Sequence, residues 1–514
     1  MLGTPPLDWA LTALLAATLA VVALRPGRWR AWAAGGLAAA GLALAASVLT
    51  LGPRWQMTPA YLAWLALAAL LAGSRLRGPR DVLRRRGILR WVGGAGLASL
   101  LVLSTAASCL FPMFDLPAPD GPFGVGGTRL KLEDLKRPEV HTANPLDHRE
   151  LMIQVWYPAD AGATGPGQPV FQHVDRLRDE MNRHGWPLGW MVTHLGQIRT
   201  HTVAAAPLAR GREAFPVIVF SHGLGSAGVQ NTVLCETLAS HGYVVVSIEH
   251  SYDGAATVFP DGRVAGFMGE AYDYTERPYP KDFEARAVAE MQSEDPKALD
   301  ALGRALVRLQ PEETASTRFW NDQWSQDQRF VIDEIERMQA GALPSPFAGR
   351  LDLSRLGVMG MSMGGQTAQV TCVGDPRCRA GVNLDGYRAV LSELPGQKAP
   401  FLYFNNGRLS VHRQFLARDH QRSYWVKVTD AEHYDFTDLP RLSPLLKTIG
   451  LSGGASPAQM QAIVDGYVLA FFDRHLRGRP APLLDQARPP WPDVKFAVGG
   501  MAESAPPSDF GKTP

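Results

Sequence analysis

The residues with the clearest chemical potential lie in the motif Gly360-Met361-Ser362-Met363-Gly364-Gly365. A strand-like apolar stretch precedes this motif and a helix-like stretch follows it. That is the setting of a nucleophile elbow, a tight turn that exposes a serine hydroxyl. Glycines on both sides of the serine allow the strand and the helix to approach closely. The alternative is a glycine-rich turn with a bystander serine, and the strand–helix context favours Ser362 as a nucleophile.

A serine hydroxyl is a weak nucleophile unless a base takes its proton. With an elbow of this kind, the expected chain order is serine, then acid, then histidine. His433 lies five residues after the predicted strand Ser423–Val428, where a catalytic loop is expected. His475 fits a charge at the C-terminal end of a helix. His412 and His420 fit solvated polar residues.

The expected acid is Asp385, which lies 23 residues after the serine and ends the first strand past the elbow. The more common position is one strand later, but there the sequence reads Asn405-Asn406 and has no carboxylate. Asp430 and Asp435 are rivals, yet they lie very close in sequence to the histidine that they would orient. Strand-end placement and triad order therefore favour Asp385.

Backbone N–H groups must stabilise the negative charge that develops on the attacked carbonyl oxygen. The residue after the nucleophile, Met363, is one expected donor. Leu224, in the loop Ser221-His222-Gly223-Leu224-Gly225, is the expected second donor. His222 precedes the nucleophile by 140 residues, so a structural hydrogen-bonding role is expected for it.

Metal and cofactor chemistry finds no support in the sequence. No His-x-x-x-His or paired Cys–His motif is present, so we expect no metal and no cofactor. Cys372 and Cys378 have no companion ligands. They fit either two free thiols or a small disulfide loop before Asp385, and a location outside the cytoplasm favours the disulfide.

Strand-like and helix-like segments alternate around these residues, which predicts a mostly parallel sheet buried on both faces. We expect long insertions near 160–205 and 253–325 and an extended tail over 486–514. The predicted strands are Glu150–Tyr157, Pro216–Phe220, Tyr243–Ile248, Leu353–Met361, Arg379–Leu384, Pro400–Phe404 and Ser423–Val428, with helices over Asn231–His241 and from the elbow to Val370.

The charge is divided unequally along the chain. The 514 residues carry 51 basic and 49 acidic side chains, a net charge of +2 that excludes nucleic-acid binding driven by bulk charge. Residues 1–112 hold eleven Arg and two Asp, a net charge of +9. Residues 113–514 hold 40 basic and 47 acidic groups, a net charge of −7. The two parts are therefore different kinds of polymer. Only four cysteines are present, which excludes a disulfide-dense scaffold.

The N-terminal part reads as membrane-spanning. A bilayer core needs about 17–25 apolar residues per helix, and Asp8 is the only charge within the apolar runs. A soluble bundle would keep a polar stripe, which these runs lack. The four runs are Leu7–Leu24, Ala31–Leu51, Met57–Gly73 and Trp91–Phe114.

Arginines set the expected orientation of these helices. Three lie between the first and second runs and seven between the third and fourth, whereas the loop after the second run holds only Arg54. The positive-inside rule then places the first and third loops in the cytoplasm and everything after residue 114 on the outer side. We expect an integral protein of a bacterial inner membrane. Charged residues at mid-helix usually mark ion or proton pathways, and the four runs have none, so we expect an anchor and not a transporter.

Several motifs together resemble the plasma-type (isoform II) platelet-activating factor acetylhydrolase family, over roughly residues 120–480. The motifs are Phe220–Gly225, Ala239–Tyr243, Ile248–His250, Gly360–Gly365, Leu384–Gly386 and His433 with Asp435-Phe436. The resemblance implies an α/β-hydrolase fold and a calcium-independent serine esterase. It implies Ser362 as nucleophile, Asp385 as acid, His433 as base, and Leu224 with Met363 as oxyanion donors.

The sequence also departs from that family. Met361 and Met363 stand where its best-known members carry His and Phe, and the helical anchor is not part of its core. Both departures leave the acyl preference open.

The leading hypothesis is a membrane-tethered esterase with an anchor over 1–114 and a catalytic domain over 115–485. Its expected partners are the bilayer and an ester substrate, foremost phospholipids with short or oxidised acyl chains. The alternatives are a broad carboxylesterase or polyester hydrolase, and a non-catalytic receptor on a hydrolase scaffold. The stretch Trp186–Met191 fits an interfacial aromatic anchor or, equally, a lid or packing segment.

Overall fold

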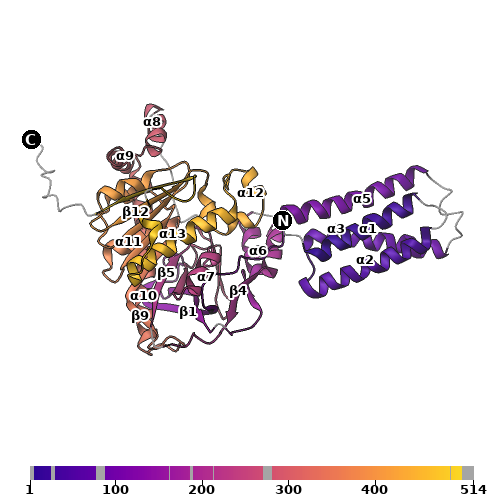
Figure 1. The fold of residues 1–514 in the computed structure, drawn as a ribbon, viewed down its shortest axis with the longest axis horizontal. Helices are drawn as coiled ribbons and strands as arrows, with labels where there is room; N and C mark the ends of the chain where they lie inside the picture. Colours follow the sequence, from indigo (N-terminus) through magenta and orange to yellow (C-terminus); the bar gives the residue numbers. More distant parts are fainter. Residues whose placement is uncertain are drawn as a thin grey trace, which may run out of the picture.

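The computed structural model describes residues 5–24, 29–76, 87–160, 162–185, 189–211, 214–269, 281–486 and 488–500. Four apolar helices lie side by side and extend away from an α/β part (Figure 1). Each has a window of at least 18 residues that is long and apolar enough to cross a membrane, and only 17–28% of each window is buried. They are α1 (Pro6–Leu24), α2 (Trp29–Leu51), α3 (Thr58–Leu76) and α5 (Gly87–Leu110). The four predicted apolar runs are therefore helices with outward-facing apolar surfaces.

A buried ion pair lies at one end of this bundle. Arg54 Nη2 lies 2.5 Å from Asp8 Oδ1, and Ser47 donates a hydrogen bond of 2.9 Å to the same oxygen. Both charged side chains are almost completely buried. Residues next to Arg54 contact the α/β part, since Gln197 donates to the carbonyl of Pro53. The chain start and the loop after α2 therefore lie together at the end that faces the α/β part.

Aromatic residues make the junction between the bundle and the α/β part. The ring of Trp55, in the short helix η1 (Trp55–Met57), lies 4.7 Å from that of Trp190 and 5.2 Å from that of Phe111. Its indole N–H donates to the carbonyl of Met191. Of the stretch expected to be an anchor or lid, residues 186–188 lie outside the described residues. Trp190 and Met191 pack on the bundle.

The sheet has the order β13-β12-β11-β10-β9-β5-β6-β2-β1-β4-β3. Its centre confirms the predicted mostly parallel arrangement, because β12, β11, β10, β9, β5 and β6 run parallel to one another. The strands are β1 (Gly124–Pro138), β2 (His148–Ala159), β3 (Gly167–Pro169), β4 (Arg199–Ala204), β5 (Phe215–Ser221), β6 (Val244–Glu249), β9 (Leu351–Met361), β10 (Ala380–Leu384), β11 (Phe401–Asn405), β12 (Ser423–Val428) and β13 (Val494–Gly499).

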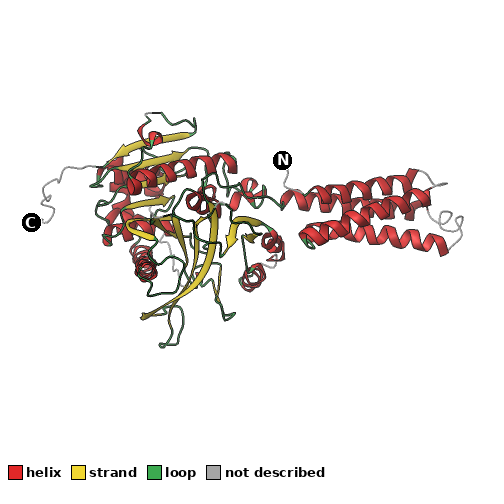
Figure 2. Cartoon of the chain, turned by 60° about the horizontal axis from the view of Figure 1, so that its bottom comes forward, coloured by secondary structure: helices red, strands yellow, loops and turns green. Residues whose placement is uncertain are grey.

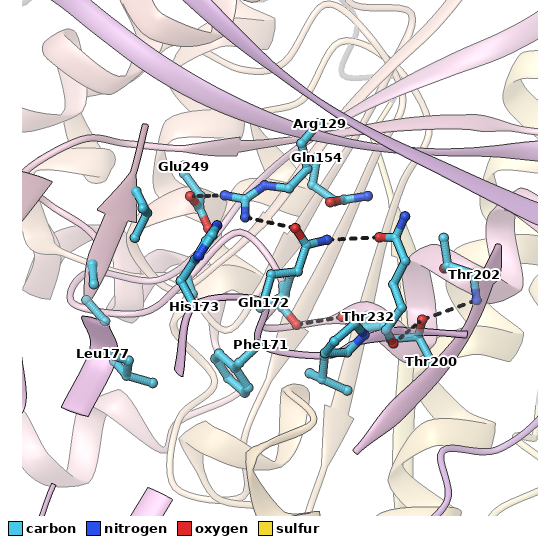
Figure 3. Close-up of a pocket in the computed structure, with 18 of the residues that line it drawn as sticks. Arg129, Gln154, Phe171, Gln172, His173, Leu177, Thr200, Thr202, Thr232 and Glu249 are labelled. Carbon is cyan, nitrogen blue, oxygen red and sulfur yellow. Dashed lines mark hydrogen bonds and ion pairs between the residues drawn. The ribbon is translucent and has the colours of Figure 1, made fainter. Parts of the chain in front are cut away.

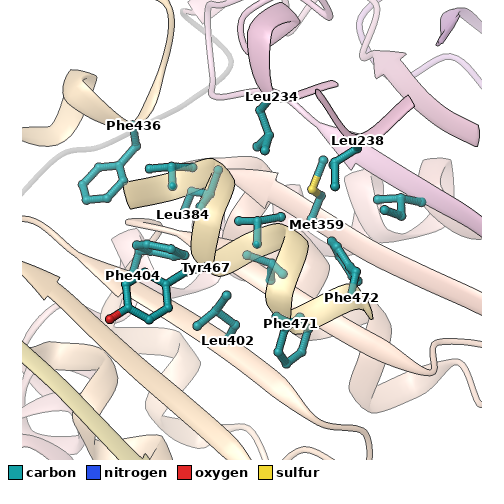
Figure 4. Packing of buried hydrophobic residues seen from close by; sticks show 14 of the residues in the cluster. Leu234, Leu238, Met359, Leu384, Leu402, Phe404, Phe436, Tyr467, Phe471 and Phe472 are labelled. Carbon is teal, nitrogen blue, oxygen red and sulfur yellow. The ribbon is translucent and has the colours of Figure 1, made fainter. Parts of the chain in front are cut away.

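Helices cover both faces of this sheet (Figure 2). Strand β5 shows why, since Val217 and Val219 enter one core and Ile218 and Phe220 enter the other. Helices α10 (Pro311–Gln339) and α11 (Met363–Gly374) pack on the first face, and α7 (Thr232–Ser240) and α13 (Pro457–Arg477) pack on the second. Figure 4 shows Tyr467, Phe471 and Phe472 of α13 over Met359, Leu384 and Leu402 of the strands. These two cores hold the strand ends in fixed positions.

The two insertions carry their own elements. The first holds α6 (Val174–Arg183), η2 (Gly189–Gln197) and the edge strands β3 and β4. The second holds β7 (Ala256–Val258), β8 (Val264–Gly266), α8 (Lys281–Met291) and α9 (Pro296–Leu309). Smaller elements are η4 (Ala389–Glu393), η5 (Val411–Ala417), η6 (His433–Phe436), η7 (Leu439–Arg441), α12 (Leu445–Thr448) and η8 (Pro482–Asp485).

Two predicted boundaries are wrong. Residues 311–325 are the first half of the 29-residue helix α10, which packs on the sheet, so the second insertion ends before 325. The expected tail from 486 contains β13, which pairs antiparallel with β12. Val494, Phe496 and Val498 alternate with the period of a strand, but the prolines close to them in the sequence favour an extended tail. Residues 501–514 lie outside the described part.

Candidate active site

Ser362 occupies a strained turn between β9 and α11. Its backbone has φ 55° and ψ −120°, a conformation that non-glycine residues rarely adopt. A methyl group on Gly360 would lie 2.3 Å from the backbone of Gly364, and one on Gly364 would lie 2.1 Å from the carbonyl oxygen of Ser221. Only glycine fits at these positions, and the tight turn presents the serine hydroxyl above the strand ends.

Ser362, His433 and Asp385 form one hydrogen-bonded chain. His433 Nε2 lies 3.0 Å from Ser362 Oγ, and His433 Nδ1 lies 2.7 Å from Asp385 Oδ2. The three residues follow β9, β10 and β12, which run parallel with β11 between the last two, so their carboxyl ends lie at the same end of the sheet. The His433 side chain is 37% exposed and Ser362 is half-buried, whereas Asp385 is buried. This arrangement can transfer the serine proton to a histidine that an outside molecule can reach.

Asn406 supports the carboxylate of Asp385. Its backbone N–H and its side-chain amide donate to the two oxygens at 2.9 and 2.7 Å. In the sequence this position shows only that a carboxylate is absent, so the supporting role of Asn406 was not predicted. The rival carboxylates bond elsewhere, because Asp435 accepts from Ser452 and Gly453 and Asp430 accepts from Gly454. Asp385 is therefore the carboxylate on His433.

Two of the other histidines differ from expectation. His412 is completely buried rather than solvated, and its nitrogens lie 2.9 Å from the carbonyl of Phe404 and 2.8 Å from that of Gly386. Burial lowers its pKa. His475 is not a helix-end charge, because burial lowers its pKa to about 4. His420 is exposed, as expected.

The loop with Leu224 lies directly beside the elbow. Gly223 donates to Gln230 Oε1 at 2.7 Å, Gly225 donates to the carbonyl of Asp253 at 2.8 Å, and Gly364 donates to the carbonyl of His222 at 3.1 Å. Within the described part of the chain, the N–H groups of Leu224 and Met363 make no hydrogen bond to a protein group. Both amides therefore remain available to a carbonyl oxygen of a bound molecule. His222 is buried and has the structural role expected of it, since its ring accepts from the N–H of His250.

Under this loop lies a second Ser–His–Asp set, which sequence reasoning missed. His250 Nε2 lies 2.9 Å from Ser221 Oγ, and His250 Nδ1 lies 2.8 Å from Asp327 Oδ2. All three side chains are completely buried. Trp324 stacks on the His250 ring at 3.8 Å, and Gln328 donates to the Ser221 hydroxyl. The position of His250 at the end of β6 was the available signal, but Asp327 lies on a distant helix.

Arginines neutralise the acid of this second set. Arg149 donates to Asp327 at 2.8 Å and also contacts Glu139 and Asp253, and Arg137 contacts the other Asp327 oxygen. Burial alone would raise the pKa of Asp327, but the charge of Arg149 and the hydrogen bond from His250 hold it well below its usual range. Burial lowers the pKa of His250. The set is thus closed to solvent, and its carboxylate is paired with two arginines, which fits a support for the loop above it.

Two pockets flank the same loop. The more polar of the two has a mixed lining that includes Gln168, Gln172 and His173, and its Arg129 and Glu249 are paired at 3.0 Å (Figure 3). The other is mainly apolar and lies between Phe114 and Tyr434. No group of three metal-ligating side chains occurs among the described residues. Cys372, at the end of α11, forms a disulfide with Cys378 before β10, which fixes the approach to Asp385.

Several known proteins are similar to this chain. The family model for platelet-activating factor acetylhydrolase, isoform II, matches residues 109–267. A probable 1-alkyl-2-acetylglycerophosphocholine esterase of Arthroderma benhamiae is 24% identical, covering 77% of this chain and 97% of its own. The platelet-activating factor acetylhydrolase of Cavia porcellus is 23% identical, covering 70% and 78%.

The chain is similar in sequence to platelet-activating factor acetylhydrolases. The resemblance seen in the sequence is thereby confirmed, and the names of these relatives are those of ester-hydrolysing enzymes. Among solved structures, the ferulic acid esterase from Streptomyces cinnamoneus matches with a TM-score of 0.55 and 27% identity, over 74% of this chain and 98% of its own. The fold is thus that of an α/β protein similar to known esterases.

Proposed function

We propose that this chain is a membrane-tethered serine esterase that hydrolyses carboxylic esters through an acyl-enzyme. The observation that carries the proposal is the hydrogen-bonded chain Ser362–His433–Asp385, with 3.0 and 2.7 Å contacts and a base open to solvent. The relationship to enzymes named as esterases supports the same reaction class.

In the proposed reaction, Ser362 Oγ attacks the ester carbonyl carbon while its proton moves to His433 Nε2. The carbonyl oxygen becomes negative, and the N–H groups of Leu224 and Met363 stabilise it. The bond between carbon and the alcohol oxygen then breaks, and His433 returns the proton to that oxygen. Water repeats the sequence on the acyl-enzyme and releases the acid. Asp385 holds the histidine in the required tautomer.

The foremost substrate class is phospholipids with a short or oxidised acyl chain. The names of the relatives, which act on 1-alkyl-2-acetylglycerophosphocholine or platelet-activating factor, support this class. The second candidate is a broad-specificity carboxylesterase, which the similarity to a ferulic acid esterase supports. Both use the same residues and differ only in the preferred ester.

In the same proposal, the four helices cross a bilayer and the α/β part lies on its outer side. The bundle spans residues 1–114 and the catalytic domain residues 115–485. Arg54, the one arginine in the outer loops of the bundle, pairs with Asp8, and the ten other arginines of residues 1–112 lie in the two loops expected inside. Alkaline phosphatase and green fluorescent protein fused to the C-terminus report the side. Phosphatase activity without fluorescence is expected for a bacterial inner membrane, and the reverse result would contradict this orientation.

A fluorophosphonate probe tests the proposed chemistry. The wild-type protein should be labelled, and the Ser362→Ala variant should not. A substrate panel then separates the two ester classes. Turnover of short-chain phosphatidylcholine above p-nitrophenyl esters supports the lipid class, whereas simple esters alone support the broad esterase. Equal labelling of wild type and variant, or none, would support a non-catalytic scaffold.

A further inference from the structure

The apolar pocket beside the candidate site has a location that points to a ligand. It has a volume of about 90 Å³. Its walls come from the segment after α5, the first insertion, the loop after Leu224 and the loop that carries His433. The residues that matter here are Phe114, Ile198, Val229, Gln230, Tyr434 and Leu439.

One wall of this pocket touches the reacting groups. The ring of Tyr434 lies 5.5 Å from that of His433 in an edge-to-face contact. Gln230 accepts a hydrogen bond from the N–H of Gly223, and a methyl group on Gly223 would lie 3.2 Å from Ser362 Cβ. Gly223 therefore lies between the pocket residue Gln230 and Ser362, and Tyr434 places the pocket next to His433.

The opposite wall belongs to the bundle end. Phe114 is four residues beyond Leu110, the last residue of α5. Ser443, which follows the pocket residue Leu442, donates to the carbonyl of Leu110. The pocket therefore lies between the end of the bundle and the loop that carries His433.

The chemistry of the walls suits a hydrocarbon chain. Most of the pocket residues are aliphatic or aromatic, and several are only half-buried. Burial raises the pKa of the lining residue Asp438 to about 7, which reduces its charge near neutral pH. The neighbouring polar pocket shares Val170, Phe171 and Val229, but its charged residues already bind one another.

We propose that this pocket binds the hydrocarbon chain of the alcohol that leaves the ester, and that this chain arrives from the bundle side. The inference rests on the proposed esterase function, because the histidine gives its proton to the leaving alcohol oxygen and the pocket begins beside that histidine. The occupant is thus a lipid-like alcohol, such as a lysophospholipid, whose chain starts in the bilayer.

Tryptophan substitutions that fill the pocket test the assignment. In full-length protein in detergent, Leu439→Trp and Ile198→Trp should lower kcat/KM for decyl acetate about tenfold or more, and leave p-nitrophenyl acetate within about twofold. Leu177→Trp, which fills the polar pocket instead, is the matched control and should change neither. An equal loss on both esters, or no loss, would overturn the assignment. A selective loss on p-nitrophenyl decanoate would also overturn it, because the acyl chain would then be the occupant.

A second readout does not depend on hydrolysis. A long-chain alcohol with a photoreactive diazirine should label peptides that contain Phe114 or Leu439 in the wild type. Labelling should fall in Leu439→Trp and persist in Leu177→Trp. Labelling confined to other peptides would contradict the pocket, whereas inactivity of the wild type on every ester, with the pocket labelled, would contradict only the esterase proposal.

Discussion

Two Ser–His–Asp sets with nearly equal hydrogen-bond lengths lie one above the other in this molecule. The upper set, Ser362–His433–Asp385, has contacts of 3.0 and 2.7 Å, and the lower set, Ser221–His250–Asp327, has contacts of 2.9 and 2.8 Å. Distances alone do not distinguish them. The solvent exposure of each set and the charged residues around it distinguish them.

In the upper set the histidine is 37% exposed, and besides this histidine the carboxylate accepts from two neutral N–H groups of Asn406. In the lower set every side chain is completely buried, Gln328 also binds the serine, and two arginines bind the carboxylate. The upper serine lies in a strained turn, whereas the lower one ends strand β5. Exposure and backbone strain are therefore the features that favour the upper set for the proposed catalysis, and their absence favours a supporting role for the lower set.

Removing each serine should give the largest difference. Ser362→Ala should lower kcat/KM for p-nitrophenyl acetate by about 10⁴-fold or more, because nothing else can form the acyl-enzyme. Ser221→Ala should stay within about tenfold of wild type, and its cost should appear as about 1–3 kcal/mol of stability from unpaired buried groups. Steady-state kinetics and thermal melts of the purified variants measure both. Comparable activity losses would mean that the lower set also takes part in the chemistry.

Asp385 and its neighbour Asn406 should differ in their effect on activity. Asp385→Asn keeps the size of the side chain but stabilises the wrong histidine tautomer, and we expect kcat to fall by about 10⁴-fold with little change in melting temperature. Asn406→Ala should lower kcat much less, because the histidine keeps its carboxylate. The comparison is made under conditions where each variant is folded. A wild-type kcat in Asp385→Asn would leave Asp385 without its proposed role.

Breaking the charge balance of the lower set should destabilise the fold. Arg149→Met leaves Asp327, Glu139 and Asp253 with less compensating charge in a buried site, and we expect a loss of about 3–5 kcal/mol. Arg210→Met is the control, because its side chain is 93% exposed and its ion pair should be worth about 1 kcal/mol or less. Denaturant titration in detergent measures the difference. Equal stability of the two variants would contradict a supporting role for the cluster.

Acid should lower the stability of the fold through the buried histidine His222, which lies beside His250 of the lower set. Burial, with His250 beside it, lowers the pKa of His222 to about 3. Between about pH 6.5 and pH 3 the unfolded chain binds a proton at His222 and the folded chain does not, so stability falls as the pH falls, by about 1.4 kcal/mol per pH unit. His222→Gln should flatten this slope by one proton, and exposed His420→Gln should not. Melting temperatures of the wild type and both variants from pH 7 to pH 4 test this prediction. Equal slopes for the wild type and His222→Gln would contradict it.

Much of the site could be read from the sequence because local chemistry marks it. The elbow glycines, the apolar strand before Ser362 and the position of Asp385 after the next strand are all short-range signals. Strand β1 escaped notice because its charged and glycine residues hide the period of a strand that pairs along β2. Asp327 and Asn406 could not be found, since their roles depend on contacts across 77 and 21 residues.

The pair of Asp8 and Arg54 has a practical consequence for shortened forms of the protein. Each side chain is buried in the bundle and depends on the other. Deleting only the first helix removes Asp8 and leaves the Arg54 guanidinium without its ion pair. A workable truncation therefore removes all four helices or keeps all four.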